Sequence, residues 1–140
     1  MAKFDYIFSL FGFHEDDTPE HNMEDFKDTP QFKIGMFTKL MANGFTYKSQ
    51  IVNVFTKADP ELDANNISDA GEFLIYNRAW YWISQCKIKS KIWKEALKGS
   101  NNDLLPPIMS CIRYFETIEE YEKCSFLKNI QDFLKENLDT

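Results

Sequence analysis

Between Phe73 and Ile83 almost every residue is large and apolar, and this run limits the folds open to the chain more than any other feature. Apolar side chains at consecutive positions fit a helix that is covered on all sides, because a surface helix keeps a polar face. We therefore predict a helix over residues 68–86, capped by Ser68 and placed at the centre of the core. Trp80 and Trp82 are expected to contribute to that core.

Helix-start signals recur elsewhere. Three capping residues precede a proline suited to the first helical position, in Thr18-Pro19, Thr29-Pro30 and Asp59-Pro60. Residues 31–43 predict a helix that stops at Gly44. Residues 46–57 are β-prone as well as helical in period, and we favour a helix because no second segment offers a strand partner.

Three further segments complete the predicted bundle. Residues 88–98 indicate an amphipathic helix that ends at Gly99, with these apolar residues inward: Ile88, Ile92, Trp93, Ala96 and Leu97. Residues 105–116 and 118–138 predict an antiparallel αα-hairpin. The sequence thus predicts an all-α fold, a compact bundle of five or six helices with this C-terminal hairpin.

Local signals also mark the ends of the C-terminal helices. Pro106 and Pro107 are expected in a first helical turn, where backbone N–H groups have no partners. Thr117 and Glu120 have the spacing of a capping box at the start of the last helix.

The segment from Ile112 to Cys124 resembles the hairpin turn of tetratricopeptide-type repeats, in which a Tyr and a small residue three positions later open the second helix, here Tyr121 and Cys124. The resemblance covers roughly 35 residues and implies peptide or protein binding. No second copy appears at a period near 34, and a repeat array needs about three units. A generic helical hairpin is the alternative that we favour.

Charge is unevenly distributed along the chain. The sequence has 22 acidic and 16 basic residues, a net charge of −6, with 8 acids and 2 lysines in residues 1–30. No Gly- or Ser-rich linker follows, so we predict an N-terminal apolar and acidic arm, residues 1–30, on a single helical domain, residues 31–140. The three widely spaced cysteines indicate neither a disulfide framework nor a zinc site. We expect no cofactor, no metal and no membrane span, and a cytoplasmic location, or a virion-associated one if the source is a phage.

The arm carries the first candidate binding site. Large apolar residues crowd its first thirteen positions, and the candidate contacts are Phe4, Ile7, Phe8, Leu10, Phe11 and Phe13. Such a stripe does not stay exposed to water. It either packs on its own core or, as we predict, docks into an identical subunit or a foreign partner.

Lysines form the second candidate site. Lys87, Lys91, Lys94 and Lys98 share one predicted helix face and are able to contact phosphate or an acidic partner. The favoured alternative is a solvated face that the acidic arm neutralises.

A helix-turn-helix over residues 31–57, turning at Asn43–Thr46, is a weaker interpretation. Gln50 stands where that motif needs an apolar residue, and the chain is acidic, so we do not expect nucleic-acid binding.

Catalytic motifs are absent from the sequence: it has no Gly-x-Ser-x-Gly elbow, no phosphate-binding glycine loop and no His-Glu-x-x-His. Arg78, inside the apolar run, is expected to pair with a carboxylate in the core, since an unpaired buried charge is costly. We interpret the chain as a small acidic protein-binding module without enzymatic activity. Its size, acidity and content of Phe, Asn and Lys resemble those of bacteriophage accessory or assembly proteins. The alternatives are an acidic inhibitor that covers a basic surface of a host protein, a DNA-binding regulator and an enzyme.

Overall fold

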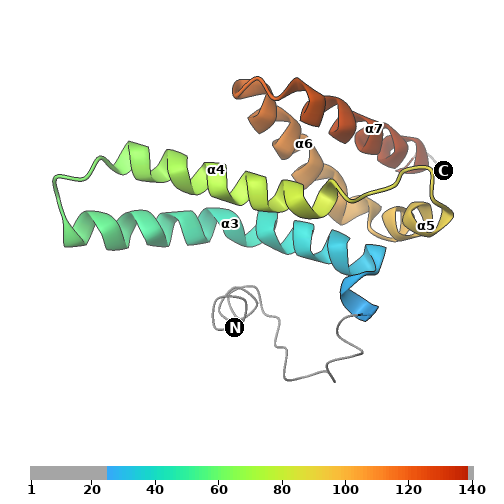
Figure 1. The fold of residues 1–140 in the computed structure, drawn as a ribbon, viewed down its shortest axis with the longest axis horizontal. Helices are drawn as coiled ribbons and strands as arrows, with labels where there is room; N and C mark the ends of the chain where they lie inside the picture. The colour runs from blue at the N-terminus through green and yellow to red at the C-terminus, as the bar shows by residue number, and fades with distance from the viewer. Residues whose placement is uncertain (1–24, 139–140) are drawn as a thin grey trace.

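The computed structural model describes residues 25–138, which form helices joined by turns. Two antiparallel hairpins dominate: α3 (Pro30–Ala58) pairs with α4 (Ala64–Ile83), and α6 (Asn101–Thr117) pairs with α7 (Tyr121–Leu138). The short α5 (Lys91–Gly99) connects them (Figure 1). The prediction of an all-α fold with a C-terminal αα-hairpin is confirmed.

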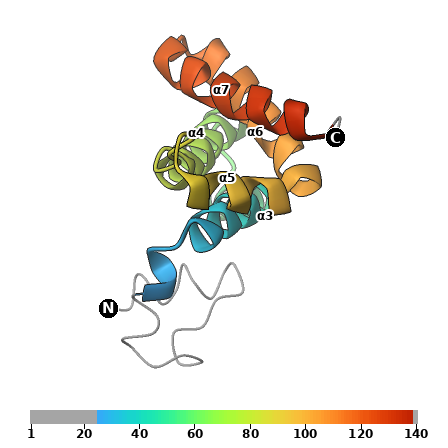
Figure 2. The same ribbon diagram turned by 90° about the vertical axis from the view of Figure 1, so that its right-hand side faces the viewer.

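The two hairpins overlap along only part of the longer one. In Figure 1, α6 and α7 lie across the half of α4 that leads toward α5, and the other half of the α3–α4 hairpin projects beyond them. Seen along that hairpin, α5 lies beside α3 (Figure 2). The core fills the overlap, and its most deeply buried side chains come from all five helices: Phe37, Ile83, Leu97, Leu104, Ile108, Phe115, Leu127 and Leu134.

The helix stop predicted at Gly44 is wrong, because α3 continues through it to Ala58. Gly44 is buried against α4, and a Cβ added there would lie 2.6 Å from Cγ2 of Ile75. The close approach of α3 and α4 therefore explains why position 44 is a glycine, and no chain reversal is involved. The continuous helix also removes the turn on which the helix-turn-helix interpretation depended.

The turn between α3 and α4 lies where Asp59-Pro60 suggested a helix start. Asp59 instead ends α3, and its carboxylate accepts a hydrogen bond from the backbone N–H of Glu61. α4 begins at Ala64 with Asp63 as its cap, whose side chain accepts from the N–H of Asn65, so the predicted Ser68 cap is wrong. Thr29 does cap α3, as expected, by accepting from the N–H of Phe32.

The apolar run of α4 is not central. Only Tyr76, Ala79 and Ile83 of this helix are buried, and Tyr81 is 60% exposed. α6 and α7 cover α4 on one side only, so a run that is apolar all round leaves some of its side chains in water. Trp80 and Trp82 are half-buried rather than fully enclosed.

Pro106 and Pro107 lie inside α6, which begins at Asn101, and not in its first turn as predicted. Each proline removes one intrahelical hydrogen bond, at a cost of about 3 kcal/mol or more in a helix interior. The earlier start buries Leu104 completely, on the same stripe as Ile108 and Phe115. Burial of a leucine contributes about 1.5–3 kcal/mol, which offsets part of that cost.

The turn from α6 to α7 is a Schellman motif and not a capping box. The N–H of Glu120 donates to the carbonyl of Phe115, and the N–H of Glu119 donates to that of Glu116. Glu119 has a positive φ of 61°, the left-handed conformation that this motif requires. The hydroxyl of Thr117, expected to cap α7, instead donates to the carbonyl of Tyr114.

We expect Glu119→Gly to raise the free energy of unfolding by about 0.5–1 kcal/mol. Glycine adopts positive φ without the steric cost of about 1–2 kcal/mol that other residues meet. Part of that gain is cancelled because glycine also increases the conformational entropy of the unfolded chain. Urea unfolding followed by circular dichroism measures the change. Glu119→Ala is the control, since it removes the carboxylate and keeps Cβ; an equal gain in both variants would assign the effect to charge and contradict the backbone explanation.

Candidate functional site

The apolar stripe of the arm, from Phe4 to Phe13, lies outside the described residues. Its docking therefore stays a prediction, and the other candidate sites lie within residues 25–138.

The lysine face is exposed, but it is only partly helical. Lys91, Lys94 and Lys98 lie on α5, whereas Lys87 precedes it in a turn. None of the four makes an ion pair within residues 25–138. Ile92, expected to point inward, is 61% exposed beside them, because Trp93, Ala96 and Leu97 form the buried stripe of α5.

Arg78 does not pair with a carboxylate in the core. It is exposed on α4 and has no ion pair among the residues that the structure describes. The apolar run around it lies at the surface, so its charge stays in water and needs no buried partner.

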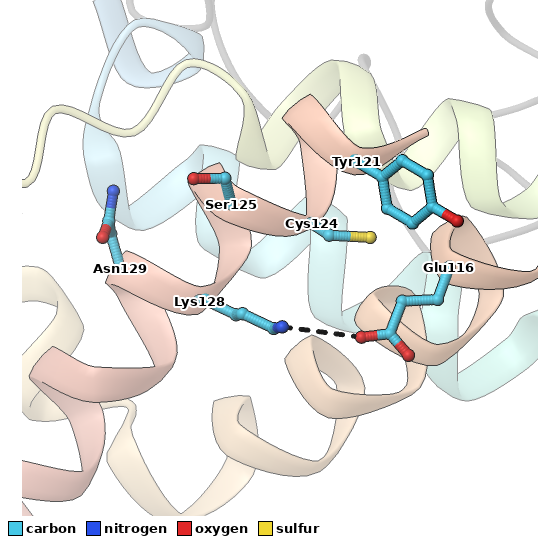
Figure 3. A pocket seen from close by; sticks show the side chains of 6 residues that line it. All are labelled: Glu116, Tyr121, Cys124, Ser125, Lys128 and Asn129. Carbon is cyan, nitrogen blue, oxygen red and sulfur yellow. Dashed lines mark ion pairs between the residues drawn. The ribbon is translucent and has the colours of Figure 1, made fainter. Parts of the chain in front are cut away.

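A surface pocket lies between the end of α6 and the first turns of α7 (Figure 3). Its lining residues are Glu116, Tyr121, Cys124, Ser125, Lys128 and Asn129. Lys128 pairs with Glu116 at 3.6 Å. The thiol of Cys124 donates to the carbonyl of Ile112, and burial, with a smaller contribution from Glu116, raises its pKa. A thiol with a raised pKa is a poor nucleophile, so this pocket lacks the arrangement that a cysteine enzyme needs.

The other two cysteines are buried more deeply. Burial raises the pKa of Cys86 and Cys111 to about 12. At pH 8 only about one thiol in ten thousand is then ionised, against roughly a quarter of exposed thiols. These residues are free thiols of the core.

We expect native protein to react with iodoacetamide at pH 8 at least about a hundredfold more slowly at Cys86 and Cys111 than unfolded protein does. The reactive species is the thiolate, and both pKa values lie above the assay pH, so raising the pH to 9 should speed native labelling roughly tenfold. Mass spectrometry of timed samples gives the rates. Stoichiometric labelling of both thiols within minutes in the native state would contradict their burial.

The projecting half of the α3–α4 hairpin is the unusual surface of the molecule. From Phe45 to Ile75 no residue is buried. Large apolar side chains are nevertheless frequent there, and those at least 40% exposed are Phe45, Val54, Phe55, Leu62, Phe73 and Leu74. In this half of the hairpin α3 and α4 pack only against each other. Much of their apolar surface therefore stays in water unless another layer covers it.

Part of this surface has a regular spacing that continues along α4 as far as Tyr81, and we call these positions the hairpin face. Its positions recur at alternating intervals of four and three residues, as in helices that pack knobs-into-holes. On α3 they are Tyr47, Ile51, Val54 and Ala58, and on α4 they are Ile67, Gly71, Leu74, Arg78 and Tyr81.

The hairpin face is turned away from α6 and α7. On α4, Tyr76 stacks on Tyr114 of α6, and Trp80 packs edge-on against Phe126 of α7. Leu74 precedes Tyr76 by two residues, which at about 100° per residue places it on the far side of the helix. On α3, Met41 contacts Cys111 of α6 at 3.7 Å, and by the same spacing Val54 points about 140° away from it.

Sequence reasoning missed this face because it assigned the whole run from Phe73 to Ile83 to the core. The signal was present in the four-three spacing from Ile67 to Tyr81, which begins before the apolar run and extends into it.

Comparison with protein-family models, with curated proteins and with solved structures finds no match for this chain. Within the described residues, none of the helices has the length and apolar character needed to cross a membrane.

Proposed function

We propose that this chain is a small, acidic protein-binding module that performs no chemistry of its own and docks through the hairpin face. The observation that carries the proposal is the unburied stretch from Phe45 to Ile75, with its exposed Val54 and Leu74. Val54 is 66% and Leu74 50% exposed, on neighbouring helices. Exposed large apolar side chains concentrated on one face mark interaction sites more often than they persist unoccupied.

The chemistry of the face supports docking by helix packing. Its positions carry no acidic side chain and one basic one, Arg78. Interface centres are depleted in charge in the same way. An inhibitor that covers a basic surface would instead place carboxylates at the contact, so the docking interpretation is favoured over that alternative. A component of a larger assembly, phage-type or other, is the kind of protein that this surface fits.

A photo-crosslinking amino acid at position 54 tests the proposal. The full chain with the probe in place of Val54 is expressed in the source cells and irradiated, and crosslinked species are identified by mass spectrometry. A matched chain carries the probe in place of Asp132, which is exposed on α7. We expect a defined protein, either foreign or a second copy, to crosslink at position 54 and not at 132.

The captured protein is then purified and its Kd for the full chain is measured. Leu74→Asp should raise that Kd at least about tenfold, since a carboxylate in an apolar contact loses its hydration. Asp132→Ala should leave it unchanged. Equal crosslinking at both positions, or a Kd indifferent to Leu74→Asp, would refute docking through this face.

A further inference from the structure

We propose that the occupant of the hairpin face is a second copy of this chain, paired about a two-fold axis so that the two hairpin tips point in opposite directions. The inference rests on the proposed function and names its partner. Two hairpins facing each other in this way form a four-helix bundle, in which the four-three stripes of each copy pack against those of the other.

Electrostatics favours contact between two copies through this face over contact through other surfaces. The chain has a net charge of −6, so two molecules repel each other at most approaches. The hairpin face brings no carboxylates of its own together. A two-fold interface repeats each contact twice, so a like-charge pair at its centre would be doubled, and this face contains none.

The orientation follows from the two charged groups on the α4 line. Asp63, the cap of α4, precedes Ile67 by four residues and so continues the stripe toward the hairpin tip. Arg78 lies fifteen residues later, about 22 Å along the helix at about 1.5 Å per residue. Antiparallel copies centred between them place Arg78 of each near Asp63 of the other. Parallel copies would instead bring the acidic tips, with Asp59 and Glu61, together.

The amount of apolar surface suits a modest interface. Val54, Leu74 and Tyr81 leave on the order of 300–400 Å² uncovered, and the half-exposed Tyr47, Ile51 and Ile67 add to it. An interface of standard size covers about 800 Å² per partner, a little over half of it apolar. A dimer with a Kd in the micromolar range is the expected result.

Light scattering on the full chain after size exclusion tests the proposal first. The 16.5 kDa chain should run at twice its mass at high concentration and dissociate on dilution through about 5 µM. Leu74→Asp should be monomeric throughout that range, and Asp132→Ala should match the parent. Arg78→Glu should raise the dimer Kd at least about tenfold by placing an acid near Asp63, while Arg78→Lys changes it less than about threefold.

A cysteine crosslink provides a second measurement that does not depend on the folding of a charged variant. Ala70 is exposed, precedes Gly71 of the hairpin face and lies midway between Asp63 and Arg78, so the proposed pairing places it near the two-fold axis. Ala70→Cys should give a covalent dimer with a short bismaleimide, and Asp132→Cys should not. The native cysteines are buried and do not compete.

The outcomes separate this inference from the function on which it rests. If the chain is a monomer at every concentration, the proposed dimer is refuted. If a foreign protein nevertheless crosslinks at position 54, docking through the hairpin face is still supported. A dimer that survives Leu74→Asp and fails to crosslink through Ala70→Cys uses another surface, and it too overturns the inference. A dimer with all the expected responses, including capture of the chain by itself at position 54, supports both.

Discussion

Replacing Phe115 by alanine is expected to lower the free energy of unfolding by about 3–5 kcal/mol, the largest effect of any single substitution proposed for this chain. Phe115 is fully buried at the point where the two hairpins cross. Its ring packs edge-on against Tyr76 and Trp80 of α4, and the ammonium of Lys123 on α7 lies 4.9 Å from its centroid. The truncation therefore opens a cavity shared by three helices, which cannot all move in to fill it.

Urea unfolding of the full chain, followed by circular dichroism and tryptophan fluorescence, measures the loss. Tyr121→Ala is the matched control, because this aromatic residue lies in the same hairpin and is 63% exposed. It should change stability by less than about 0.5 kcal/mol. If Phe115→Ala lowers the free energy of unfolding by less than about 1 kcal/mol, and the slope of that free energy against urea concentration is unchanged, the packing of the two hairpins does not depend on this contact.

The elements of this fold were predictable where a local pattern and the tertiary environment agree. Thr29 before Pro30 predicts the start of α3, and the spacing within residues 88–98 predicts that Trp93, Ala96 and Leu97 face inward; both are confirmed. Each depends on neighbours within one or two turns. The C-terminal αα-hairpin follows from two such helices and the few residues between them.

The misassigned features depend on which helix lies beside which. The apolar run of α4 indicates burial, but how many of its sides are covered depends on the position of α6 and α7. The prolines of α6 indicate a helix start, yet the burial of Leu104 extends the helix in front of them. The hairpin face was missed for the same reason. Its four-three spacing indicates a docking surface only when it is known that no other helix covers that side of α4.

Gly44 shows the same ambiguity in a single residue, and a pair of substitutions resolves it. Gly44→Ala is expected to lower the free energy of unfolding by about 1–2 kcal/mol. Alanine improves helix propensity by about 1 kcal/mol, but its methyl group would lie 2.6 Å from Ile75, and overpacking of this kind costs about 1–3 kcal/mol or more. The clash is with the γ2 methyl group, which is bonded to the branched Cβ of Ile75 and is held close to the backbone, so it has little freedom to move away.

Gly35 provides the matched control, because it lies in the same helix and a Cβ added there has no neighbour within 4 Å. Gly35→Ala should therefore raise stability by up to about 1 kcal/mol. The double variant Gly44→Ala/Ile75→Ala should lose less stability than the sum of the two single losses, because removing the Ile75 side chain removes the clash. The difference, which is the coupling between these two contacting residues, should be about 1 kcal/mol or more. If Gly44→Ala instead stabilises the chain as Gly35→Ala does, then α3 and α4 are not in close contact at this level. The two stripes of the hairpin face would then no longer be held on one surface, and docking through it would lose its geometric basis.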